Sequence, residues 1–286
     1  MRSNTPATVI DLGMSDELDA PPSLGVPVDP APGPANAAGV SVLRALRTPF
    51  EAEHWLGRLC VTSLWLCIPV VGLIAVRGWA SEGMARMLQN HPDPFPRLRL
   101  ADFRTHVRRG MPAAAVEFFG IAAILFAIGA SVFLINAGVW ATIISGGSLA
   151  LALLGAGVAL GAALCGWVVL VANAILTRAE IMGRLGQALG TGQVWPQARG
   201  AWGQTLRAYA LFLPLSLGLL ALGASIGCIG VVPAWVAVQI AATQLRFQLY
   251  QAQLRGGAPA LTAPSPRLLP SEKRLLSRGK LEARAK

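Results

Sequence analysis

Long apolar stretches alternate with shorter, arginine-rich polar segments along most of this chain. From Phe118 to Thr177 the sequence runs for sixty residues without Asp, Glu, Lys or Arg. Because one membrane-spanning helix needs about 20 apolar residues, this stretch has room for two spans and a connector. We expect helices over residues 112–136 and 148–176, joined by the glycine-containing segment 136–148.

A second apolar region covers residues 208–243. The glycine-containing cluster 227–230 and the nearby Pro233 interrupt it, and such clusters are typical of turns. The pattern therefore predicts two more spans joined by a tight turn, the second of which continues as a helix to Leu254.

The first apolar run, Leu59–Val76, is shorter. As a helix it would be about 27 Å long, slightly less than a ~30 Å hydrocarbon core. Pro69 in its middle leaves two interpretations, a short spanning helix and a re-entrant segment that turns back. Trp55 and Trp79 bracket the run like an interfacial aromatic belt and favour the spanning helix. The predicted fold is an all-α, polytopic transmembrane helix bundle with four to five spans.

Two polar tails flank the apolar region. Residues 1–47 form a proline-rich acidic segment, residues 48–254 the transmembrane helical domain, and residues 255–286 a flexible basic tail. The tails contain too few apolar residues to offset the conformational entropy lost on ordering. We therefore expect both tails to be disordered.

The composition argues against a water-soluble globular enzyme. Hydrophobic residues make up 54% of the chain and charged residues 13%, with a mean hydropathy of +0.54, whereas soluble domains average about 25% charged residues. The four cysteines lie inside apolar segments and form no CxxC pair, the histidines stand in separate segments, and no phosphate-binding glycine motif is present. We expect no catalytic residue, no metal and no cofactor.

The net charge of +10 is distributed unevenly. Residues 77–110, residues 178–207 and the C-terminal tail are basic, whereas residues 138–147 are uncharged. Basic loops remain in the cytoplasm according to the positive-inside rule. The pattern predicts a multi-pass protein of a cytoplasmic (inner) membrane with a cytoplasmic C-terminus. The side of the N-terminus depends on whether residues 59–76 span.

The basic segment before residue 112 also contains apolar residues at helical spacing. Leu98, Phe103 and Val107 among its arginines predict a short amphipathic helix on the membrane surface. Aromatic residues do not alternate with the arginines as in single-strand nucleic-acid binders. We therefore expect anionic lipid headgroups, and not nucleic acid, as the partner of Arg97, Arg99, Arg104, Arg108 and Arg109.

Few polar groups fall inside the predicted spans. Glu117 is the only acid there, and an intramembrane ionisable residue is a candidate proton or cation site. Its position soon after Pro112 also allows a structural role near the cytoplasmic interface. Asn136, Asn173 and Gln239 are further transport candidates, or alternatively form hydrogen bonds between helices.

Two pairs of glycines have the spacing of close helix contacts. Gly157 and Gly161 lie in the predicted helix 148–176, and Gly223 and Gly227 lie in the following span. Small residues four positions apart let helix backbones approach closely. The first pair indicates either packing within one bundle or homodimerisation.

Several blocks of the sequence resemble one family. The blocks at the start of the likeness are Pro49–Trp55, Ile68–Gly72 and Arg77–Trp79. They resemble the opening of domain-of-unknown-function family 4013, and the likeness covers about residues 48–252. It implies a prokaryotic multi-helix membrane protein without an established activity, so no catalytic residue is carried over.

Together these features predict a non-enzymatic scaffold or accessory subunit that presents cytoplasmic loops and tails to a membrane or cytoplasmic protein partner. The alternative is a small-solute or ion transporter or channel that uses Glu117 and the intramembrane Asn residues. A membrane enzyme is the least supported class, because no acid–base or nucleophile pair converges in the sequence.

Overall fold

The computed structural model of the chain describes residues 39–51, 55–91, 94–96, 98–145, 148–261, 269 and 271. Within these residues all regular structure is helical, and four helices are long and apolar enough to cross a membrane. The predicted all-α, polytopic fold is therefore confirmed.

The elements are α1 (Val42–Glu51), α2 (Trp55–Leu66), α3 (Val71–Leu88), η2 (Leu100–Asp102), α4 (Phe103–Ser145), α5 (Ser148–Met182), α6 (Leu185–Ala188), α7 (Thr191–Gly200), α8 (Trp202–Ser225) and α9 (Cys228–Arg255). Most residues of the tails predicted to be disordered, 1–47 and 255–286, lie outside the described residues. Residues 42–47 differ from the prediction, because they are helical as part of α1.

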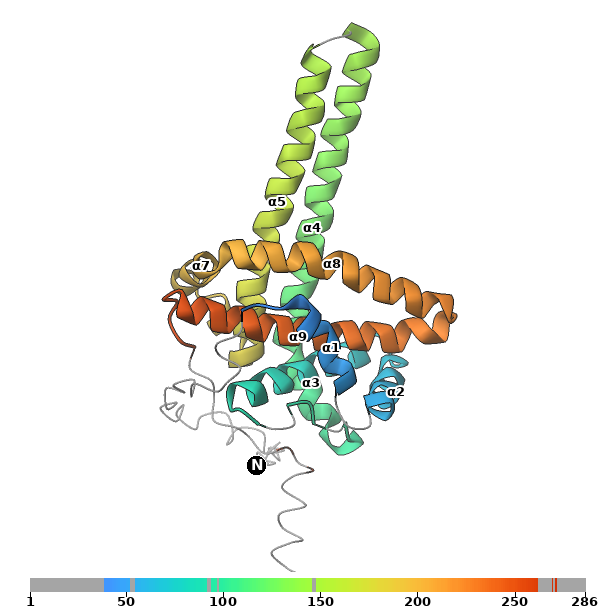
Figure 1. Cartoon of the computed structure of the whole chain (residues 1–286), viewed down its shortest axis with the longest axis vertical. Coiled ribbons are helices and arrows are strands. Elements are labelled where there is room, and N and C mark those ends of the chain that lie inside the picture. Colours follow the sequence, from blue (N-terminus) through green and yellow to red (C-terminus); the bar gives the residue numbers. More distant parts are fainter. Residues whose placement is uncertain are drawn as a thin grey trace, which may run out of the picture.

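Helices α4 and α5 form a long hairpin that projects from the rest of the molecule (Figure 1). They have 43 and 35 residues, and their outer parts expose large apolar side chains such as Phe126 (77% exposed) and Leu151 (73%). Residues 118–143 alone extend about 39 Å at 1.5 Å per residue, enough to cross a ~30 Å hydrocarbon core. This hairpin is the clearest membrane-spanning unit of the chain.

The hairpin corrects two predictions. The connector expected over residues 136–148 is wrong, because α4 continues to Ser145 and α5 begins at Ser148. The separate surface helix expected around Leu98 to Val107 is also wrong, because α4 runs without a break from Phe103 through Pro112. Glycine and proline interrupt apolar membrane helices less often than helices of soluble proteins. In an apolar environment the backbone N–H and C=O groups must form their hydrogen bonds within the helix, which favours its continuation.

Helices α8 and α9 form a second hairpin, which runs across the first in Figure 1. Its tight turn lies at Ile226 and Gly227 as predicted, and the φ of +95° at Gly227 favours glycine. Gly223 of α8 packs directly against Gly230 of α9. Helix α9 continues to Arg255, one residue beyond the predicted end.

The first apolar run does not form one spanning helix. α2 ends at Leu66 and α3 begins at Val71, with turn residues between them and a φ of 62° at Val70. Pro69 causes the break, because proline lacks an amide hydrogen and disfavours helical geometry at the preceding residue. The single helix favoured for residues 59–76 is therefore wrong, and the alternative, a segment that turns at Pro69, agrees with the structure.

Helix α3 lies at the centre of the folded body and contacts α4, α5 and α9. Trp79 is fully buried there, and its indole N–H donates a hydrogen bond to the Pro96 carbonyl oxygen at 2.8 Å. Gly78 of α3 and Gly110 of α4 bring the two backbones into direct contact. The C-terminal half of α3 is thus buried, and charged side chains of α3 form ion pairs with α4.

Candidate functional site

A buried ion pair joins α5 to α9. The Arg246 guanidinium donates two hydrogen bonds to the Glu180 carboxylate, from Nε to Oε2 at 2.9 Å and from Nη2 to Oε1 at 2.7 Å. Their side chains are 3% and 0% exposed. Nη2 also donates to the Thr243 hydroxyl at 3.0 Å. This bidentate geometry fixes the two helices relative to each other, because loss of either partner would leave a buried charge alone.

A second ion pair joins α3 to α4. Nε and Nη2 of Arg77 contact the two carboxylate oxygens of Glu117, and the side chains are 3% and 23% exposed. Burial lowers the pKa of Arg77 to about 9, so the guanidinium remains charged at neutral pH. Arg246, Glu180 and Tyr209 are close enough to influence it electrostatically. Two arginines and two carboxylates from four helices therefore form one electrostatic unit.

Uncharged polar groups complete this unit. The Tyr209 hydroxyl donates to Asn173 Oδ1 at 2.9 Å and lies beside the Arg246 guanidinium. Gln239 stands two turns before Arg246 on the same face of α9. Among the residues that the structure describes, Arg77 Nη1, Asn173 Nδ2 and Gln239 Oε1 are buried without a hydrogen-bond partner. We refer to this group as the polar core; its members are Arg77, Glu117, Asn173, Glu180, Tyr209, Gln239 and Arg246.

A further set of charges links α3 and α4. Glu82 accepts a hydrogen bond from Arg86 Nε at 3.0 Å, and its other carboxylate oxygen pairs with Arg109. Asp102 accepts from the Ser271 backbone N–H at 3.0 Å. Each carboxylate of the described residues thus has a partner, and these residues are Glu51, Glu82, Asp102, Glu117 and Glu180.

Three of the four polar candidates identified in the sequence belong to the polar core, namely Glu117, Asn173 and Gln239. Asn136 does not, because it is exposed on α4 and donates to the Val132 carbonyl oxygen of its own helix at 2.9 Å. The contact of Glu117 with a buried arginine accords with the structural role considered for it. A role in transport stays a prediction for all four residues.

The glycine pairs pack within the chain. Gly157 and Gly161 of α5 face α4, where Gly161 lies next to the Ser131 side chain. Gly223 contacts α9, and Gly227 forms the turn between α8 and α9. Because α4 already covers the Gly157–Gly161 face, homodimerisation would use another surface. Whether the chain dimerises stays a prediction.

The basic candidates are mostly exposed. Arg99, Arg104 and Arg108 are exposed, and no carboxylate of the described residues pairs with them. Arg109 pairs with Glu82 instead, and Arg97 lies outside the described residues. We refer to the three exposed arginines, which lie at η2 and the first turns of α4, as the basic surface.

The sequence interpretation missed Arg77, Glu180 and Arg246 as members of a site. It assigned the first two to polar loops, but α3 and α5 continue through them to Leu88 and Met182. The sequence did contain an indication of this site, because each of these charged residues comes at or just after the end of a long apolar stretch, where the helix can continue. Charges at such positions commonly face the interior of a bundle and pair with one another.

Comparison with known proteins places the chain in a family. Residues 61–243 match the family described as "Protein of unknown function (DUF4013)". This range lies within residues 48–252, where the sequence likeness was found, and it includes all of α3, α4, α5 and α8. No curated protein and no solved structure matched the chain significantly. The chain, a helical membrane protein with a buried polar core, therefore belongs to the DUF4013 family, whose activity is unknown.

Proposed function

We propose that the chain is a non-enzymatic scaffold or accessory subunit of a prokaryotic cytoplasmic membrane. In this role it presents the basic surface and its tails to a protein partner on the cytoplasmic side. The observation that supports the proposal is that the charges of the polar core are paired with one another, whereas the arginines of the basic surface have no carboxylate partner in the part of the chain that the structure describes. The ionised groups of the polar core pair with one another across four helices, whereas Arg99, Arg104 and Arg108 are exposed and unpaired within the described residues.

Paired charges suit a scaffold because they hold helices in fixed positions. A bidentate buried pair is costly to separate, so it stabilises one arrangement and resists exchange with a passing solute. The sequence pattern led us to expect anionic lipid headgroups at the exposed arginines. In the scaffold proposal these arginines meet instead an acidic segment of a protein partner, and their positive field accelerates the encounter. Both features support a chain that organises other proteins.

Site-specific photo-crosslinking in the native host tests this proposal. A photoreactive residue replacing Arg104 should give discrete protein-sized adducts, whereas one replacing Phe126, which is 77% exposed on the apolar hairpin, should not. Replacing Arg99 and Arg108 by glutamate should remove the adducts made from position 104. Absence of adducts at position 104, or equal adducts at 104 and 126, would contradict the proposal.

The unused hydrogen-bonding atoms of the polar core favour a second candidate, a small-solute or ion transporter. Arg77 Nη1, Asn173 Nδ2 and Gln239 Oε1 have no partner among the described residues. Groups of this kind would bind a small polar solute if a path opened to them. In this alternative, Glu117 exchanges its arginine partner for the transported species.

Flux through proteoliposomes distinguishes the two candidates. For a scaffold, we expect the reconstituted full-length chain to conduct protons and potassium no faster than empty liposomes, with the proton flux followed by an enclosed pH-sensitive dye. A flux that Glu117→Gln abolishes and that Gly129→Ala leaves unchanged would establish the transporter. The Gly129 variant is a suitable control because Gly129 is exposed on the same helix and has open space around it.

A further inference from the structure

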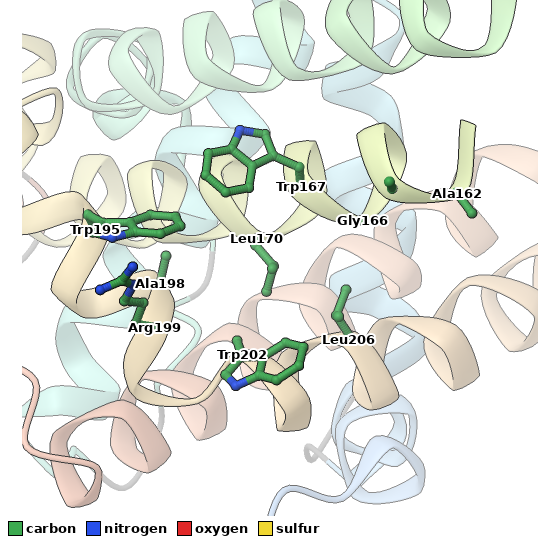
Figure 2. Close-up of a pocket in the computed structure, with 10 residues that line it drawn as sticks. Ala162, Gly166, Trp167, Leu170, Trp195, Ala198, Arg199, Trp202 and Leu206 are labelled. Atoms are coloured by element: carbon green, nitrogen blue, oxygen red, sulfur yellow. The ribbon is translucent and has the colours of Figure 1, made fainter. Parts of the chain in front are cut away.

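A pocket opens where α5, α7 and α8 meet, and none of its lining residues belongs to the polar core (Figure 2). Its volume is about 440 Å³, within the ~300–1,000 Å³ typical of small-molecule sites. Ala162 and Gly166 of α5 form part of one wall, and Leu170, Ala198 and Leu206 add apolar side chains. The pocket therefore offers a mainly apolar surface with room created by small residues.

Three tryptophans surround the pocket. The ring centres of Trp167 and Trp195 are 4.8 Å apart, and Trp202 lies near Leu206 in Figure 2. The three tryptophans are between 36% and 61% exposed. Tryptophan is enriched where an apolar environment meets a polar one at the membrane surface. A cluster of partly exposed tryptophans at this place therefore suits the level of a membrane interface.

Arg199 supplies the charge of the pocket. It is the one charged residue among the described lining residues, and its guanidinium lies 4.6 Å from the centre of the Trp195 ring. Each carboxylate of the described residues has another partner. A planar guanidinium without a carboxylate partner, placed beside an apolar cavity, suits a phosphate group with an apolar chain attached.

The position of the pocket along α5 also suits a lipid. Toward the tip of the hairpin, α5 exposes apolar side chains such as Leu151 and Val158, at 73% and 61%. From Asn173 onward most of the helix is buried in the folded body. The pocket residues, 162–170 of α5, lie between these two parts. A lipid bound here would place its chain along the exposed apolar part and its headgroup beside the polar body.

We propose that this pocket binds one anionic phospholipid of the surrounding bilayer. The phosphate contacts Arg199, and a segment of one acyl chain lies between the indoles and the small residues of α5. Basic pockets between transmembrane helices bind anionic headgroups in the same way. A zwitterionic lipid offers the same chains but adds a cation that Arg199 repels, so the site selects a net negative headgroup.

Native mass spectrometry of retained lipid tests the proposal. The full-length chain is reconstituted into vesicles of equal phosphatidylglycerol and phosphatidylcholine, extracted in mild detergent and analysed for bound lipid. The unaltered chain should retain one phosphatidylglycerol in preference to phosphatidylcholine. Arg199→Gln should lower this retention about tenfold or more, because a charge-assisted contact with phosphate is lost.

A second variant tests the apolar half of the pocket. A Cβ at Gly166 would lie 3.7 Å from Leu206 Cδ2, in ordinary contact, so Gly166→Leu should extend into the cavity and displace the chain. Gly129→Leu is its control, because that position lies on α4 outside the pocket and has open space around it. Arg184→Gln is the control for charge, since Arg184 is exposed outside the pocket. Both controls should retain the lipid.

Addition of inorganic phosphate separates a lipid site from a phosphate site. Free phosphate lacks the apolar chain, so millimolar phosphate should leave the bound lipid in place. The proposal would be overturned if the chain retained the two lipids equally or if Arg199→Gln retained phosphatidylglycerol fully. It would also be overturned if Arg184→Gln lost the lipid or if phosphate displaced it. Circular dichroism checks the fold of Gly166→Leu, and Arg199→Gln decides the outcome if that variant does not fold.

Discussion

An Arg246→Ala variant should have a free energy of unfolding about 3–5 kcal/mol lower than that of the unaltered chain. The reason is that the Glu180 carboxylate, which is 0% exposed, would lose both of its hydrogen bonds from Arg246 and remain as a buried, uncompensated charge. Denaturant unfolding in mild detergent, followed by far-ultraviolet circular dichroism, measures this loss.

A double variant distinguishes the ion pair from general damage to the helix interface. Combining Glu180→Gln with Arg246→Met removes both charges together, so most of the stability should return, as it often does when a buried pair is replaced as a whole. Arg207→Ala removes an exposed arginine of α8 and should change little. If the double variant were as unstable as Arg246→Ala alone, an isolated buried charge would not explain the effect.

Gly78→Ala should destabilise the folded body by about 1–3 kcal/mol or more, despite the higher helix propensity of alanine. A Cβ at Gly78 would overlap the His106 carbonyl group and approach the Gly110 backbone, where α3 and α4 are in direct contact. Because the obstacle is backbone, no rotation of a side chain relieves it. The same unfolding measurement reports the loss.

Gly129→Ala is the matched control for this substitution. Gly129 is exposed on α4 with no other group within 4 Å of a Cβ. Alanine there should be neutral or stabilising by up to about 1 kcal/mol, because it is the better helix former. Equal stability of the two alanine variants would show that the α3–α4 contact tolerates a wider separation than the structure describes.

Much of the fold follows from local sequence patterns. The sixty uncharged residues between Phe118 and Thr177 predict two spans, because no such stretch of helix is stable with its apolar surface in water. The glycine cluster near residue 227 predicts the tight turn at its observed position. The boundaries near residue 145 and the break at Pro69 were predicted less well, because whether a glycine or proline ends a helix depends on what surrounds it.

The polar core was predicted only in part. Glu117, Asn173 and Gln239 stood out as polar groups within apolar segments. Arg77 and Tyr209, the partners of Glu117 and Asn173, did not stand out, and neither did the Glu180–Arg246 pair. Sequence position does not show that residues 77 and 117, or 180 and 246, meet across helices. Long-range pairs of this kind arise from the packing of several helices at once.

The amino-acid sequence by itself determined the helical class, the two apolar helical hairpins and the family, since hydropathy, turn residues and motif order are local properties of the chain. The tertiary structure alone decided which buried charges neutralise one another and that Trp167, Trp195 and Arg199 line one pocket. The physical reason is that burial makes an unpaired charge costly. The role of a buried charged residue therefore depends on which partners the packing of the helices places beside it.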